Sequence, residues 1–169
     1  IRECELTDFL ALGIKPALVV TDSQAFGYVA ATLPASTPLT SFSILFARQK
    51  GNFEHLLHDT PQIDKLRDGD NVLILESCTH QTSCDDIGRI KIPRMLRQHT
   101  GKELNFSVVS GLSELPDTIN DIALVIQCGA CMVTRRQLLN RLQIFEAEGI
   151  PITNYGMTLA YLNGIFERA

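Results

Sequence analysis

The residues best suited to chemistry in this sequence fall in two short motifs that are far apart along the chain. Cys78 and His80 form a Cys-x-His pair, and Cys128 and Cys131 form a Cys-x-x-Cys pair. Three thiolates and one imidazole can hold a metal, because zinc accepts a Cys₃His set and iron–sulfur clusters bind mainly to thiolates. One Cys-x-x-Cys pair with one remote cysteine suits a cubane held by three thiolates, with one iron open to exchange. The residues alone favour an iron–sulfur cluster slightly and leave zinc open.

Each motif also has a simpler interpretation. Cys128 and Cys131 can act as a dithiol oxidoreductase pair, a chemistry that needs neither Cys78 nor His80. A zinc-stabilised protein-interaction module is the other alternative, although structural zinc sites generally use two close ligand pairs. His80 is a candidate fourth ligand of the metal. The other candidates for that position are Glu76, Cys84, an aspartate of the same loop, and water.

Both motifs follow apolar runs that predict buried strands. Ile122–Ile126 is a short continuous apolar run, typical of a strand covered on both faces, and Val72–Leu75 is another. Parallel α/β sheets bind ligands at the carboxyl ends of their strands, so we expect the two motifs to meet there. Asn154 follows a later strand and is expected at the rim of the same site.

Strands and helices alternate over residues 68–169, which predicts a domain with a parallel β-sheet flanked by helices. We expect this domain to bind the iron–sulfur cluster, with the metal site at the carboxyl ends of its strands. Thr134 and Gln137 form a capping box at the start of one helix, and Gly149 marks its end. The predicted strands are 72–75, 104–109, 122–126 and 151–153, and the predicted helices are 93–99, 135–148 and 155–168.

Residues 1–67 are predicted to form a smaller dimerisation module, so that the whole chain has an α/β fold. Ser41 and Ser43 alternate with apolar residues, which predicts a half-buried strand over 39–46. The edge of Phe42–Phe46 is expected to pair with a second copy and extend a sheet across two chains. The other elements predicted here are a linker helix at 2–12, a strand at 17–20, a helix at 24–33 and a helical turn or two at 52–57.

Composition narrows the class of protein. The 169 residues are 45% hydrophobic and carry a formal net charge of -4, with no basic tract, which argues against a nucleic-acid binder. No apolar run approaches the about 20 residues of a membrane span. Five cysteines, an odd number, favour a reducing, cytoplasmic compartment over a disulfide framework. The sequence begins with Ile-Arg-Glu rather than Met, and we expect it to be part of a longer protein.

The two motifs together resemble the CxH…HCxxC signature of HydF, the GTPase and scaffold family of FeFe-hydrogenase maturation. Gln127 stands where the family pattern often has histidine, so a histidine ligand is not expected on this side of the site. The resemblance covers nearly the whole chain. Further similar stretches are residues 21–26, 39–48, 84–89 and 152–156.

This resemblance implies a 4Fe-4S cluster bound by Cys78, Cys128 and Cys131, with His80 as a candidate fourth ligand. It also implies a homodimer, or a tetramer, that carries a diiron precursor from two radical S-adenosylmethionine maturases to apo-hydrogenase. The chain would correspond to the family without its amino-terminal GTPase domain. A G-x-x-x-x-G-K-[ST] loop is missing, so we expect this part neither to bind GTP nor to act as an enzyme.

Overall fold

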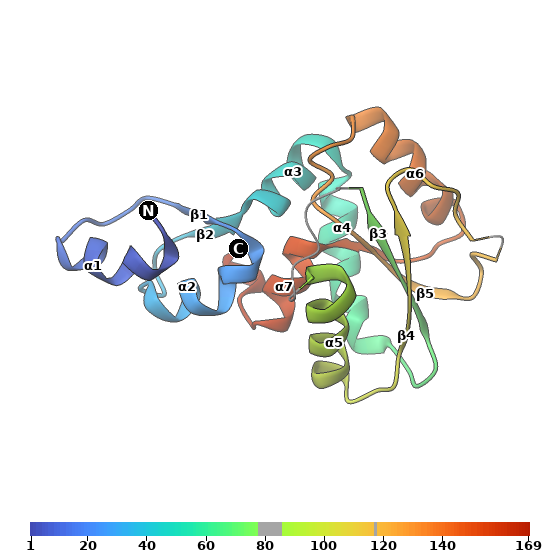
Figure 1. Cartoon of the computed structure of the whole chain (residues 1–169), viewed down its shortest axis with the longest axis horizontal. Coiled ribbons are helices and arrows are strands. Elements are labelled where there is room, and N and C mark those ends of the chain that lie inside the picture. The colour runs from blue at the N-terminus through green and yellow to red at the C-terminus, as the bar shows by residue number, and fades with distance from the viewer. Residues whose placement is uncertain (78–85, 117) are drawn as a thin grey trace.

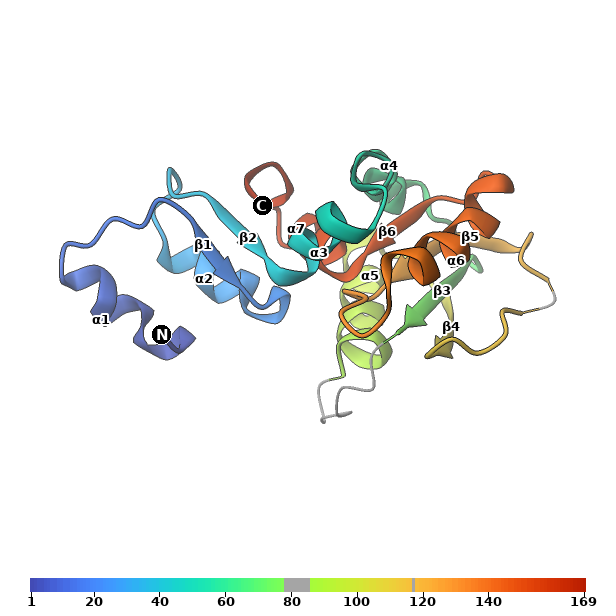
Figure 2. The same ribbon diagram turned by 90° about the horizontal axis from the view of Figure 1, so that it is seen from above.

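Two parallel sheets organise the chain, and the computed structural model describes residues 1–77, 86–116 and 118–169 (Figures 1 and 2). The first part contains α1 (Leu6–Ala11), β1 (Val19–Thr21), α2 (Phe26–Thr32), β2 (Leu39–Ser41) and α3 (Phe42–Lys50). The second contains α4 (Phe53–Asp59), β3 (Asn71–Glu76), α5 (Ile92–Thr100), β4 (Asn105–Ser110), β5 (Ile122–Gln127), α6 (Arg135–Ala147), β6 (Ile152–Asn154) and α7 (Tyr155–Leu162).

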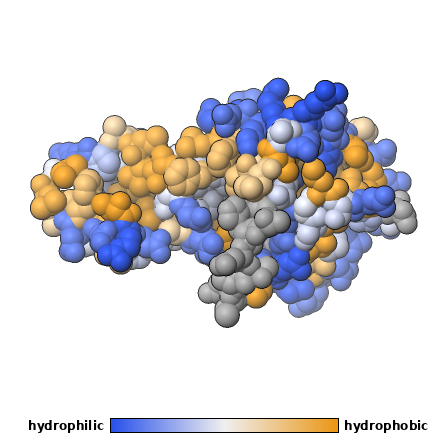
Figure 3. Space-filling view, turned by 45° about the horizontal axis from the view of Figure 1, so that its top comes forward, coloured by the Kyte–Doolittle hydropathy of each residue, from blue (hydrophilic) through white to orange (hydrophobic). Residues whose placement is uncertain are grey.

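The first part is built on β1 and β2, which pair in parallel with Val19 opposite Leu39. The Asp22 side chain caps the turn before α2 by accepting a hydrogen bond from the backbone N–H of Gln24 at 2.8 Å. Phe26 of α2 is fully buried, but many apolar side chains remain exposed on this part of the molecule (Figure 3). They include Leu12, Ile14, Leu18, Val20, Tyr28, Phe42 and Leu45.

The predicted strand over 39–46 is wrong beyond Ser41. The Ser41 hydroxyl accepts a hydrogen bond from the backbone N–H of Ile44, and α3 begins at Phe42. Ile44 and Ala47, three residues apart, are the buried side chains of this helix, as the helical repeat requires. The Ser–apolar alternation therefore reflects an N-cap followed by a helix, and Phe42–Phe46 offers no strand edge to a second copy.

The second sheet confirms the predicted α/β fold. Its four strands are all parallel, in the order β4-β3-β5-β6. The central strands β3 and β5 are almost wholly buried, whereas residues along the edge strand β4 are exposed or half-buried. The predicted strands 72–75, 104–109, 122–126 and 151–153 match these four to within one or two residues.

The sheet is wound in two directions from its centre. The connection through α5 leads outward from β3 to β4, and the connection through α6 leads outward in the opposite direction from β5 to β6. Right-handed crossovers in opposite directions place their helices on opposite faces of the sheet. Figure 1 shows α5 and α7 on one face and α6 on the other. The carboxyl ends of β3 and β5 therefore flank the switch point, where such sheets bind ligands.

The last predicted helix is shorter in the structure than in the sequence prediction, whereas the helix before it begins as predicted. The capping box of Thr134 and Gln137 is present at α6, and Gly149 after this helix has a φ of +68°. The helix predicted over 155–168 is shorter, because α7 ends at Leu162 and Gly164 adopts a φ of +69° before a final 3₁₀ turn. Across the described parts of the chain, no helix has the length and apolar character needed to cross a membrane.

Candidate metal centre

The Cys-x-x-Cys motif lies on the loop that leaves β5 at the switch point. The backbone N–H of Cys128 donates to the carbonyl oxygen of Leu75 at 2.9 Å, so the loop starts out paired with β3. Cys128 is buried, with 6% of its surface exposed, and Cys131 is exposed. Between them, Ala130 has a φ of 54°, a left-handed conformation that costs a residue other than glycine about 1–2 kcal/mol. Contacts from elsewhere must hold this loop in place.

Lys50, the last residue of α3, provides such contacts. Its ammonium donates to the backbone oxygens of Ala130 at 3.0 Å, Cys131 at 3.2 Å and Val133 at 3.1 Å. These three bonds match the three donors of a lysine ammonium. Nothing local in the sequence predicts them, because Lys50 and Ala130 are 80 positions apart. The first part of the chain thus fixes the thiol loop of the second.

The sulfur of Cys128 is surrounded by donors. It accepts hydrogen bonds from the backbone N–H of Ser77 at 3.0 Å and from the Gln127 amide at 3.4 Å. Ser77 follows β3 and directly precedes Cys78 in the sequence. Cys78 and His80 themselves lie outside the described residues, as does Cys84. The structure therefore joins the Cys-x-x-Cys loop to the end of β3, the strand that leads to the Cys-x-His motif.

A buried arginine lies behind this loop. Arg141 of α6 is only 7% exposed, and its Nη1 donates to the carbonyl oxygen of Gly111 at 3.0 Å. Its Nε and Nη2 atoms are buried and have no hydrogen-bond partner among the described residues. Burial lowers the pKa of the Arg141 guanidinium, and the charge of Cys128 acts in the opposite direction. A cation thus lies in the interior within electrostatic reach of a cysteine.

Three polar residues named from the sequence have other partners. Gln127 is buried and its amide nitrogen also donates to the Ser77 hydroxyl at 3.0 Å. Asn154 caps α7 by accepting from the Met157 N–H at 2.8 Å. The carboxylate of Glu76, a candidate fourth ligand, accepts hydrogen bonds from Arg89 at 3.0 Å and Ser110 at 3.3 Å. These side chains support the carboxyl edge of the sheet.

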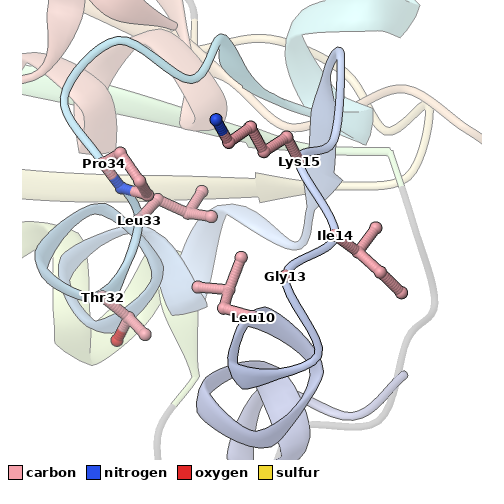
Figure 4. Close-up of a pocket in the computed structure, with 7 residues that line it drawn as sticks. All are labelled: Leu10, Gly13, Ile14, Lys15, Thr32, Leu33 and Pro34. Atoms are coloured by element: carbon pink, nitrogen blue, oxygen red, sulfur yellow. The ribbon is translucent and has the colours of Figure 1, made fainter.

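Within residues 1–77, 86–116 and 118–169, no three histidine, cysteine or acidic side chains form a group that could hold a metal ion. Two of the three predicted cysteine ligands, Cys128 and Cys131, lie within these ranges. A pocket in the first part of the chain lies away from this loop, and residues from α1 and the end of α2 line it (Figure 4). Its lining is mainly apolar and includes no thiol: Leu10, Gly13, Ile14, Lys15, Thr32, Leu33 and Pro34.

The fold and the loop define a class of protein: a doubly wound α/β domain with a thiol pair at its switch point, preceded by a small module with an exposed apolar surface. Comparison with protein families narrows this class. Residues 54–169 match the model of the hydrogen maturase F tetramerization domain, and residues 1–51 match that of the hydrogen maturase F dimerization domain. The chain belongs to the hydrogen maturase F family, HydF. No curated protein matches it.

The family assignment confirms the resemblance found in the sequence and gives the chain a role in hydrogenase maturation. Dimerization and tetramerization domains also support the predicted assembly into homo-oligomers. Neither matched model describes a GTPase domain.

Proposed function

We propose that this chain is a scaffold that binds a 4Fe-4S cluster through Cys78, Cys128 and Cys131 and carries the diiron precursor to apo FeFe-hydrogenase. The observation that carries the proposal is the hydrogen bond of 3.0 Å from the backbone N–H of Ser77 to the Cys128 sulfur. It joins the loop with two of the proposed ligands to the residue that precedes the third. It supports the expectation that the two motifs meet at one edge of the sheet, an expectation that the described residues do not test.

The surroundings of Cys128 fit a thiolate–iron cluster. Two N–H donors reach its sulfur, and the buried guanidinium of Arg141 lies within electrostatic reach. Both features stabilise negative charge on sulfur. A cluster held by three thiolates leaves one iron with an exchangeable ligand, and His80 is our candidate for that position.

The proposal favours cluster binding over dithiol exchange. In thioredoxin-like proteins the activated Cys-x-x-Cys thiol lies at a helix N-terminus, where the dipole favours the thiolate. Here Thr134 is the N-cap of α6, and both cysteines precede it in the sequence. The helix therefore does not begin on either thiol.

We further propose that the first part of the chain forms the homodimer and that a tetramer is the larger assembly. Exposed apolar side chains gather over this part of the surface (Figure 3), and burial against another copy would remove them from water. The two radical S-adenosylmethionine maturases and the apo-hydrogenase are the proposed partners in cargo transfer. GTP is not a proposed ligand of this part of the protein.

The test is anaerobic reconstitution of the whole chain with iron and sulfide. We expect about four irons per chain and a 4Fe-4S signal in electron paramagnetic resonance after reduction. Alanine at Cys78, Cys128 or Cys131 should abolish the signal, whereas Cys4→Ala, at an exposed cysteine of the first part, should preserve it.

Two results would refute the proposal. One tightly held zinc in a colourless protein would favour the zinc-stabilised interaction module. Reversible oxidation of Cys128 and Cys131 without any metal requirement would favour the oxidoreductase.

A further inference from the structure

The guanidinium of Arg141 lies in the interior without an acidic partner. Its side chain comes from the buried stripe of α6, where Leu138, Leu142 and Phe145 pack against the sheet. No carboxylate pairs with it among the described residues. Removing a cation from water without an anion nearby is costly, so a buried arginine is normally paired. Within residues 1–77, 86–116 and 118–169, no acidic side chain compensates the charge of Arg141.

Cys128 is the group to which the structure points. Arg141 donates to Gly111, and the backbone N–H groups of Gly111 and Cys128 both donate to the end of β3, to the carbonyl oxygens of Glu76 and Leu75. The charge of Cys128 also favours the charged form of the guanidinium. The Cys128 sulfur already accepts from the backbone N–H of Ser77 and the amide of Gln127. Donors and positive charge thus converge on this side of the thiol loop, and Nε and Nη2 of Arg141 have hydrogen atoms to donate. Such surroundings suit sulfur that carries the negative charge of a metal–thiolate centre.

A purely structural role of Arg141 accounts for its hydrogen bond but not for its charge and its other buried nitrogen atoms. Through Nη1, Arg141 ties α6 to Gly111, which follows β4 and begins the crossover to β5. One neutral donor would suffice for this hydrogen bond to Gly111. A guanidinium brings in addition a permanent charge and two buried nitrogen atoms that find no acceptor within the described part of the chain.

We propose that Arg141 is the charge-compensating residue of the metal centre and favours the reduced, more negative state of the bound cluster. This inference rests on the proposed cluster binding. In the low dielectric of the interior, a fixed positive charge acts strongly on a nearby anion. The charge and hydrogen bonds around a cluster set its reduction potential, so loss of Arg141 must make the cluster harder to reduce.

The experiment compares the reduction potentials of clusters in four variants with that of the wild-type chain, by titration with dithionite under argon. Arg141→Gln preserves a donor for Gly111 but removes the charge, and Arg141→Met removes both. Arg141→Lys keeps the charge. Arg135→Gln is the matched control, because it removes an exposed arginine from the same helix.

We expect the equilibrium constant for one-electron reduction to fall at least tenfold in the Gln and Met variants, a shift of about 59 mV or more. The Lys variant and the Arg135 control should stay within threefold of wild type. If Gln or Met instead prevents cluster uptake in a chain of unchanged circular dichroism while Lys preserves it, the charge requirement is also supported.

Equal potentials in all five proteins would overturn the role of Arg141 and leave the proposed function intact. A Lys variant that shifts as far as Met would also overturn it, because the effect would then follow the shape of the side chain and not its charge. If the wild-type chain takes up no iron and sulfide, the proposed function fails, and this inference fails with it.

Discussion

Replacing Lys50 with methionine should release the thiol loop. Methionine keeps an unbranched apolar stem of nearly the same length beside Phe46, over whose ring the ammonium lies at 5.1 Å. It removes the three hydrogen bonds to the carbonyl oxygens of Ala130, Cys131 and Val133. The loop then loses the cation that holds Ala130 in its left-handed conformation.

The size of the effect follows from these bonds. A hydrogen bond to a charged donor contributes about 1.5–3 kcal/mol when buried. Lys50 is only half-buried, so water can replace part of each bond, and we expect well under 1 kcal/mol from each. The relaxation of Ala130 lowers the cost of opening further. A total of about 2 kcal/mol corresponds to about 30-fold in the opening equilibrium of the loop.

The assay is the rate of Cys128 alkylation by N-ethylmaleimide in metal-free protein, measured on the cysteine-containing peptide by mass spectrometry. Cys128 is buried and must be exposed before it reacts, so the labelling rate follows loop opening. Lys65→Met, at an exposed lysine, is the control and should leave the rate unchanged. A Lys50→Met rate within threefold of wild type, in a chain that remains folded, would refute the reasoning.

Two further predictions concern α7. The Tyr161 hydroxyl donates to the Asp64 carboxylate at 2.6 Å, and this bond raises the pKa of Tyr161 to about 12. Asp64→Asn should return that pKa toward about 10, as measured by ultraviolet titration of the phenolate. Because the pKa is higher in the folded state, the bond's contribution to stability is complete below about pH 10 and is lost between about pH 10 and 12. Gly156→Ala should destabilise the protein by about 1–3 kcal/mol in urea unfolding, because the added Cβ would lie 2.8 Å from Ser41 Oγ and 2.9 Å from Ile44 Cγ1.

Each of these predictions has an outcome that contradicts it. An unchanged tyrosine titration in Asp64→Asn would show that the carboxylate does not set the pKa of Tyr161. A Gly156→Ala protein as stable as wild type would show that the clash costs no more than the helix propensity that alanine adds.

The sequence predicts local features of this fold well. The four parallel strands follow from apolar runs, and the cap of α6 follows from Thr134 and Gln137. The strand predicted over 39–46 fails because a serine N-cap and its following helix produce the same short alternation as a strand. Periodicity over so few residues cannot distinguish a strand from a helix. In α3 the buried side chains are Ile44 and Ala47, whereas Phe42, which the alternation places on the buried face, is exposed.

The candidate site is only partly predictable, because its supporting contacts join distant parts of the chain. The place of Cys128 and Cys131 after β5 follows from the apolar strand before them. The sequence analysis did not single out Arg141, although its position offers a sign. It stands within the apolar stripe of α6, where an arginine is unusual. No feature of the sequence indicates the contacts of Lys50, because its three partners follow it by 80 or more positions.

The position of α3 has a practical consequence for anyone who divides this protein. The two family matches separate between residues 51 and 54, so α3 falls with the dimerization domain. Ser43 of this helix nevertheless bonds to Asn154 and Gly156. A fragment that starts at residue 54 would therefore lack α3. The apolar side chains that α3 covers would become exposed and would promote aggregation. The boundary between the family domains and the boundary of a unit that folds by itself differ here by one helix.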